Sequence, residues 1–239
     1  MTLLALGVLV VAFLYACVGH AGASGYIAVM TLCGVVPAEL KPAALVLNIL
    51  VATVGTIQFC RAGHFSWRLF WPFAVVSAPF AFLGGLLSLP AAALKAALGV
   101  VLLFSAARFL WNPGEKPGAA PPPVPAALGA GAALGLLSGL TGTGGGIFLT
   151  PLALIMGWGA TKTVAGVSAA FILVNSISGL AGLLGSGGGV PSFVWPLAGA
   201  ALVGGAIGSH LGSRRLAPAA IRRLLSAVLV IAGLKLILA

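Results

Sequence analysis

The sequence predicts an all-α protein that crosses a membrane several times and consists of two repeats of inverted topology. Hydrophobic residues make up 61% of the 239 residues and charged residues only 6%, with a mean hydropathy of +1.20. Soluble domains carry about one quarter charged residues, so lipid must cover much of this apolar surface. Glycine-rich breaks interrupt the apolar runs at 17–31 and 137–150, and a hydrophilic Pro-rich segment divides the chain near its midpoint.

Matching residues recur in the same order in the two halves, which indicates a duplication. Trp71-Pro72 returns as Trp195-Pro196, 124 positions later. At the same offset lie Gly55 and Gly179, Gly63 and Gly187, and Gly84 and Gly208, while Gly19 and Gly22 match Gly139 and Gly142 at a shift of 120. The sequence therefore predicts a first membrane repeat at 1–111, a Pro-rich cytoplasmic linker at 112–125 and a second membrane repeat at 126–239.

Each half is expected to contain a helix, a break, a short helix and three long helices. The expected helices are 2–18, 26–36, 42–60, 69–88 and 91–111 in the first half, and 124–138, 147–157, 163–184, 193–213 and 218–238 in the second. A helix needs about twenty residues to span the hydrocarbon core, which the three long runs of each half provide. The run–break–run unit before them predicts a broken or re-entrant hairpin, and the crossing count stays open between about six and ten.

The basic residues favour opposite orientations of the two halves. They lie at the ends of apolar runs, where they set orientation. Inverted halves place nine of them on one side, namely Arg61, Arg68, Arg108, Lys116, Lys162, Arg214, Arg215, Arg222 and Arg223, and leave Lys41, Lys95 and Lys235 opposite. Parallel halves would divide them seven to five. The positive-inside rule then predicts a multi-pass membrane protein with both termini outside the cytoplasm.

Composition also argues against several function classes. The net charge of +10 is spread over helix ends and forms no basic-aromatic patch, so nucleic-acid binding is not expected. The three cysteines lack metal-ligand spacing, and neither a metal nor a cofactor is expected. Nucleotide-loop motifs are absent, and no catalytic constellation lies in the apolar runs, which argues against an enzyme. The acidic side chains are Glu39 and Glu115, so the membrane interior lacks a carboxylate relay.

The two breaks are the predicted substrate site. Non-helical backbone at membrane depth must be covered by protein or line a cavity. The helix that restarts after each break presents N–H groups and a partial positive charge, which favours an anion. Inverted repeats around such segments are typical of secondary transporters with a site near the bilayer midplane. Glycines also permit close helix packing, but three in succession at 144–146 break a helix, which favours the site interpretation.

The candidate substrate-binding residues come from both breaks and from the helices that follow them. They are His20, Gly22, Ala23, Ser24, Gly25, Asn48, Gly142, Thr143, Gly144, Gly145, Gly146, Ser168 and Asn175. His20 has three open roles: contact with an anion, titration, or capping of a helix end. Asn48 and Asn175 either line the path or hydrogen-bond between helices, and Asn175 is favoured for the path because Ser168 lies nearby on the same helix.

The second-half stretch GLTGTGGGIFLTPLALIMGW, followed by TKTVAGVSAAFILVNSISGLAGLL, resembles the second-repeat signature of the sulfite exporter TauE/SafE family. The stretch that begins GHAGASGYIAVMT resembles its first repeat. The resemblance implies a bacterial inner-membrane permease with a duplicated fold that moves sulfite, sulfoacetate or related organosulfonates, usually outward. The matching positions are Gly142, Gly144, Gly145 and Gly146 in the second break and Gly19, Gly22 and Gly25 in the first.

The first break departs from the family's glycine-rich pattern at His20, Ala23 and Ser24, which leaves the exact substrate open. The expected function is a secondary transporter, in the export direction, whose partners are a small anion and the lipid bilayer. A passive anion channel, or a permease for another small organic anion, is the alternative. The sequence leaves open whether the protein acts as a monomer or a homodimer.

Overall fold

A computed structural model describes residues 1–87, 102–107, 120 and 122–238 of the chain. Its elements are all helices: α1 (Thr2–Cys17), α2 (Ala23–Leu32), α3 (Pro37–Arg61), α4 (Trp67–Leu86), α6 (Val124–Thr141), α7 (Gly146–Met156), α8 (Thr161–Gly185), α9 (Val194–His210), the π-helix η1 (Leu211–Arg215) and α10 (Pro218–Leu238). Residues 102–107 are also helical. Most of the predicted helix 91–111 and of the predicted linker 112–125 lies outside the described residues.

Five of the described helices are long and apolar enough to cross a membrane: α3, α4, α6, α8, and α9 together with η1. The helices on either side of the breaks are apolar, and α1, α2 and α7 are only 10–17 residues long. The prediction of an all-α polytopic membrane protein is therefore confirmed. Both predicted run–break–run units are present, as α1 and α2 around the first break and α6 and α7 around the second.

The ends of equivalent helices match between the halves. Helices α3 and α8 each have 25 residues, and each is followed by a left-handed glycine, Gly63 at φ 77° and Gly187 at φ 87°. Helices α2 and α7 both start after a left-handed glycine, Gly22 and Gly145. These two glycines are 123 positions apart, so the shift of 120 predicted for the breaks is wrong. Glycines recur at several spacings in GTGTGGG, and only the backbone shows which one begins the helix.

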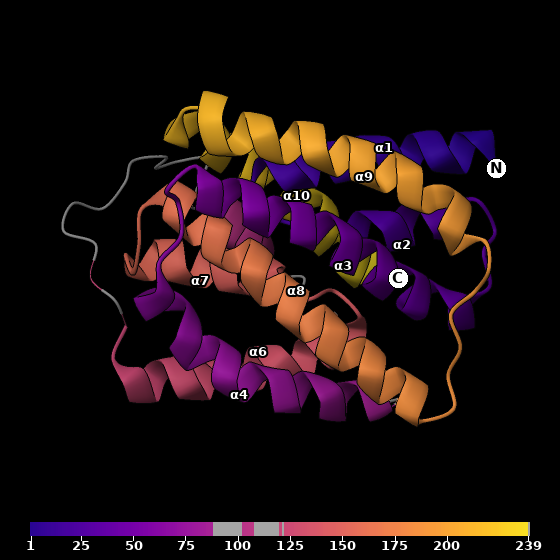
Figure 1. Cartoon of the computed structure of the whole chain (residues 1–239), viewed down its shortest axis with the longest axis horizontal. Coiled ribbons are helices and arrows are strands. Elements are labelled where there is room, and N and C mark those ends of the chain that lie inside the picture. Colours follow the sequence, from indigo (N-terminus) through magenta and orange to yellow (C-terminus); the bar gives the residue numbers. More distant parts are fainter. Residues whose placement is uncertain (88–101, 108–119, 121, 239) are drawn as a thin grey trace.

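Figure 1 shows α1 alongside α9, α4 alongside α6, and α3 crossing close to α8 in the middle of the molecule. Asn48 of α3 lies beside Ser176 of α8. Nearer the end of α3, a Cβ at Gly55 would lie 3.7 Å from Ala169, which is nearer the start of α8. These two equivalent helices therefore run in opposite directions, as inverted repeats require. Opposite insertion of the halves in a bilayer stays a prediction.

Glycines at every fourth position bring two helix pairs into backbone contact. On α6, Gly131, Gly135 and Gly139 face the α4 backbone at Phe73, Ser77 and Ala81, and on α9 and η1, Gly204, Gly208 and Gly212 face the α1 backbone at Leu9, Phe13 and Cys17. Any side chain at these positions would force the helices apart. Close helix packing, the alternative role of the second glycine-rich stretch, thus applies to Gly139. The break itself begins after Thr141.

Candidate functional site

The two breaks meet around one small cavity. It is lined by Tyr15, His20, Ala21, Gly22, Ala23, Ser24, Thr143, Ile147 and Ile172. Its volume is about 10 Å³, which is about the space that the centre of one water molecule needs. Residues from α1, both breaks, and the starts of α2 and α7 therefore converge on the middle of α8, where Ile172 lies.

His20 connects the two breaks. Its Nε2 atom lies 3.0 Å from the carbonyl oxygen of Gly146 and 3.1 Å from Oγ1 of Thr150. A carbonyl oxygen only accepts hydrogen bonds, so Nε2 carries the proton and donates it. Thr150 Oγ1 in turn donates to Ser168 Oγ at 2.6 Å. A polar chain thus runs from the first break through α7 to α8, which makes His20 a cross-link between the breaks and gives Ser168 a defined partner.

Gly144 brings the second break into contact with α3 and α8. Its φ is +75°, and a Cβ there would lie 2.6 Å from Ile172 Cγ2, 2.9 Å from Ser176 Oγ and 3.1 Å from Asn48 Nδ2. Only glycine adopts this backbone conformation without strain and leaves room for those side chains. Asn48 Nδ2 donates to Ser176 Oγ at 3.4 Å. The amide of Asn48 therefore lies against the second break.

Several buried polar atoms around the breaks lack a hydrogen-bond partner among the described residues: Nδ1 of His20, Oδ1 of Asn48, Oγ of Ser138, and both amide atoms of Asn175. Each such atom costs about 1–3 kcal/mol when it is left unpaired, and native proteins usually pair them. Asn175 lies one helical turn from Ile172 on α8, and so on the same face. Such a concentration is typical of a site for a polar ligand. Thr56 and Gln58, farther along α3, also carry such atoms.

The hydroxyl groups of the first break are already paired. Tyr15 OH and Ser24 Oγ lie 2.9 Å apart, and Tyr26 OH donates to the carbonyl of Ala21. Sequence reasoning missed both tyrosines. They are the two tyrosines of the chain and lie on either side of the first break, which is the signal that could have found them.

Of the predicted site residues, five line the cavity, namely His20, Gly22, Ala23, Ser24 and Thr143, and eight do not, namely Gly25, Asn48, Gly142, Gly144, Gly145, Gly146, Ser168 and Asn175. Two of these eight lie against residues of other helices. Gly25 faces α1, where a Cβ would lie 2.6 Å from Val11 Cγ1. Gly142 faces the stem of Lys41, where a Cβ would lie 2.9 Å from Lys41 Cγ. The Lys41 ammonium donates to the carbonyl of Gly84 at 3.4 Å. Sequence reasoning used Lys41 only for orientation, because nothing in the linear order relates the start of α3 to a glycine a hundred residues later.

The backbone around the cavity presents donor groups. Neither α2 nor α7 has a side-chain cap at its first turn, and the N-terminus of a helix carries a partial positive charge. The cavity lining contains no carboxylate. Within the described part of the chain the acidic side chain is Glu39, in the first turn of α3. The arrangement can therefore hold an anion by backbone amides and hydroxyl groups.

Comparison with known proteins agrees with this geometry. The family model described as "Sulfite exporter TauE/SafE" matches residues 3–236. A protein of Sinorhizobium fredii named "Probable membrane transporter protein y4hK" is 42% identical over 241 residues, covering 98% of this chain and 97% of that protein. No solved structure matches the chain significantly. The match extends over both predicted repeats and both breaks, and the chain therefore belongs to the sulfite exporter TauE/SafE family of membrane transporters.

Proposed function

We propose that this protein is a secondary transporter that exports small sulfur-containing anions, such as sulfite, sulfoacetate or related organosulfonates. The observation that carries the proposal is the meeting of two glycine breaks at one cavity surrounded by buried, unpartnered polar atoms of the described residues. The substrate would bind there, between two inverted repeats. The family is described as sulfite exporters, which supports this class of substrate.

The charges around the breaks support an anion over a cation. Lys41 lies against the second break, and both restarting helices present their N-termini. Thr143 and Ser24 add hydroxyl groups to the lining, which holds no carboxylate. A cation would have only carbonyl and hydroxyl oxygens to bind, opposed by two positive helix ends.

The size of the cavity supports a carrier over an open channel. A volume of about 10 Å³ admits about one water molecule and is therefore too small for sulfite, which has four heavy atoms. The surrounding helices must therefore move before an anion enters. Carriers expose a central site alternately to each side by such movements.

The distribution of basic residues supports an inner-membrane location with both termini in the periplasm. Arg61, Lys162 and Arg214 come from distant segments, yet they line one groove. They belong to the nine residues that the inverted arrangement places on one side, and Lys41 lies at the other end of α3 from Arg61. An inside-negative potential drives an anion outward by about 2.3 kcal/mol per charge per 100 mV, so export needs no other coupling.

The test is transport by the purified protein in proteoliposomes. Labelled sulfite and sulfoacetate are expected to leave the vesicles with saturable kinetics, and unlabelled substrate on the far side should accelerate the efflux. Protein-free vesicles and the Gly144→Leu variant are the controls. Anion current without trans-stimulation would establish the alternative, a passive channel. Flux of a cation, with no flux of sulfite, sulfoacetate or another small anion, would overturn the proposal.

A further inference from the structure

A second polar site lies away from the glycine breaks, at the end of the molecule where α3 ends and α8 begins. Arg61, Ala62, His64, Lys162, Ser213 and Arg214 line an open groove of about 400 Å³. These residues come from the last turn of α3 and the loop after it, the first turn of α8, and η1. We call this the basic groove.

The basic groove collects cations without a neighbouring carboxylate among the described residues. Glu39, the acidic side chain within that part of the chain, lies 22 residues before Arg61 on the same helix, which is about 33 Å at 1.5 Å per residue. Mutual repulsion between like charges at short range costs free energy. Burial and the nearby Lys162 ammonium lower the pKa of His64, so this imidazole is neutral at pH 7.

The favourable interaction of cations with helix C-termini explains only some of the basic residues in the groove. Arg61 and Arg214 lie in the last turns of α3 and η1, where the negative end of a helix stabilises a cation. Lys162 is the second residue of α8, where the positive end of the helix disfavours one. Its Nζ atom donates to the carbonyl of Ser213 at 3.3 Å. This acceptor is neutral, so it does not balance the positive charge of the ammonium. A helix N-terminus and three cations thus face the same open groove, which is the chemistry of a phosphate site.

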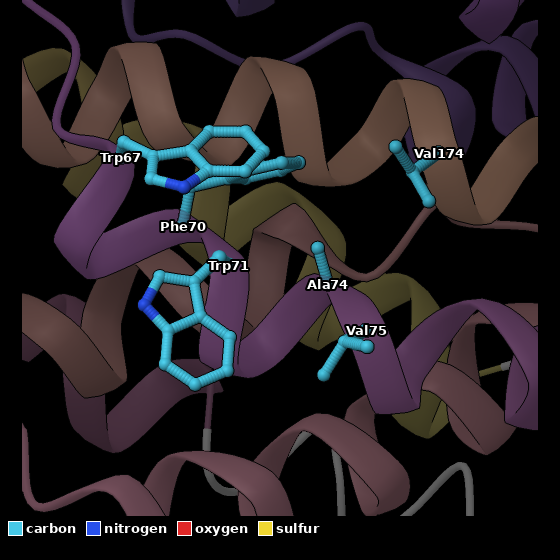
Figure 2. Close-up of a pocket in the computed structure, with 6 residues that line it drawn as sticks. All are labelled: Trp67, Phe70, Trp71, Ala74, Val75 and Val174. Atoms are coloured by element: carbon cyan, nitrogen blue, oxygen red, sulfur yellow. The ribbon is translucent and has the colours of Figure 1, made fainter.

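An apolar groove lies next along the chain. Trp67, Phe70, Trp71, Ala74, Val75 and Val174 line a space of about 460 Å³ (Figure 2). Figure 2 shows the α4 residues on one side and Val174 of α8 across from them. Trp67 follows His64 by three residues, so the two grooves begin within about 10 Å of each other. Trp67 is 65% exposed and Trp71 39% exposed, and exposed tryptophans of this kind mark the membrane–water interface.

We propose that the basic groove binds the phosphate of an anionic phospholipid, such as phosphatidylglycerol, and that one of its acyl chains lies in the apolar groove. Basic pockets between transmembrane helices on the cytoplasmic side bind lipid headgroups in this way. A soluble anion would use the cations but not the tryptophan-lined groove. The bound lipid would hold the start of α8 against η1 and the α3–α4 loop. Helix α8 also carries Ser168, Ile172 and Asn175 of the candidate site between the breaks.

The test measures thermal unfolding of the full chain in nanodiscs of pure phosphatidylcholine and in discs with added phosphatidylglycerol. The added lipid is expected to raise the melting temperature of the wild type. In the double variant Lys162→Gln, Arg214→Gln this protection should require about thirtyfold more phosphatidylglycerol, since each basic residue near the surface contributes about 1 kcal/mol. The matched double variant Arg215→Gln, Arg223→Gln loses the same charge at exposed positions outside the groove and should keep the wild-type response.

Further arms separate the sources of the anion. Inorganic phosphate added to phosphatidylcholine discs should protect little, and Trp67→Ala should weaken protection by phosphatidylglycerol. Equal protection by a soluble anion would overturn the lipid assignment, as would an equal phosphatidylglycerol response in both double variants. If the groove variant fails to fold, the test is which lipids the wild-type protein retains when it is purified in detergent. Equal retention of phosphatidylcholine and phosphatidylglycerol would overturn the proposal. The measurement needs no transport, so it stands apart from the test of the proposed function.

Discussion

The first break, at residues 18–22, and the second, at 142–145, each end one helix and begin another at a left-handed glycine, but they differ in the side chains around them. The first carries His20 and is closed by two tyrosine hydroxyls. The second has three left-handed glycines, Gly142, Gly144 and Gly145, and its polar surroundings come from Asn48, Ser176 and Ser138 on other helices. The first break thus supplies the imidazole of His20, whereas the second supplies the hydroxyl of Thr143 and leaves room for polar side chains of other helices.

This difference makes the candidate site asymmetric although the two halves are predicted to be repeats. The helix starts at Gly22 and Gly145 are equivalent, so His20 corresponds in position to Thr143 and Ala21 to Gly144. The imidazole of His20 reaches across to Gly146, and no equivalent side chain returns from the second break. Variants at the two breaks should therefore affect transport and stability to different extents.

Gly144→Leu should have the largest effect and abolish transport. The left-handed φ costs a non-glycine residue about 1–2 kcal/mol, and the added side chain would displace Ile172 and Asn48. Efflux from proteoliposomes measures the loss, and the amount of protein in the membrane fraction measures insertion. Gly129→Leu is the control, because a Cβ there meets nothing within 4 Å. Wild-type efflux by Gly144→Leu would remove the second break from the site, and failure to insert would assign it to packing.

Asn175→Ala should weaken substrate binding about tenfold, equivalent to about 1.4 kcal/mol, and Asn48→Ala should weaken it less. Both amide atoms of Asn175 are unpartnered within the described structure, whereas Asn48 already donates to Ser176. The substrate dependence of efflux gives the affinities. The melting temperature without substrate should change little for Asn175→Ala, because no protein hydrogen bond among the described residues is lost. Equal effects of the two variants would contradict the preference for Asn175.

His20→Leu should destabilise the protein by about 1–3 kcal/mol, because it leaves the buried carbonyl of Gly146 without its donor. Transport should slow several-fold, since the cross-link between the breaks is lost. His20→Gln keeps an N–H donor and should recover most of the stability. Thermal unfolding and efflux of the two variants check this pair. A glutamine variant as unstable as the leucine variant would show that shape, rather than the donor, matters at this position.

Ser24→Ala should have the smallest effect, about 0.5–1.5 kcal/mol of stability, as is typical of one hydrogen bond. Tyr15→Phe removes the same bond from the other side. Because both changes remove one shared interaction, the double variant should lose less than the two single losses added together. A double-mutant cycle by thermal unfolding measures this coupling. Fully additive losses would show that the hydrogen bond between Tyr15 and Ser24 contributes nothing to stability.

Much of the fold could be predicted because its signals are local. The runs predicted at 42–60 and 163–184 became α3 and α8, each extended by a few residues at its ends. The short helix predicted at 26–36 begins earlier, at Ala23, because Gly22 supplies the left-handed turn that starts it. Part of the candidate site could also be predicted. His20 and Ser168 lie in the hydrogen-bonded chain between the breaks, and Gly144 lies against Ile172 and Ser176.

Residues that reach the site across the fold could not be predicted. Tyr15 and Lys41 lie in an apolar helix and at a helix start, and linear order does not reveal that they face the breaks. Gly25 and Gly142 lie in the glycine-rich stretches where site residues are expected, but they pack against Val11 and Lys41 instead. Whether a glycine contacts a ligand or a neighbouring helix depends on the rotation of its own helix, which a glycine-rich stretch does not encode.

The sequence by itself determined that this is a helical membrane protein with two broken elements, because hydropathy and helix breaking depend on residues close together in the chain. The tertiary structure alone decided that the breaks meet, that His20 donates to Gly146, and that Asn48 approaches Gly144. These contacts join residues more than ninety positions apart. They form because the antiparallel crossing of α3 and α8 brings both halves to the same point.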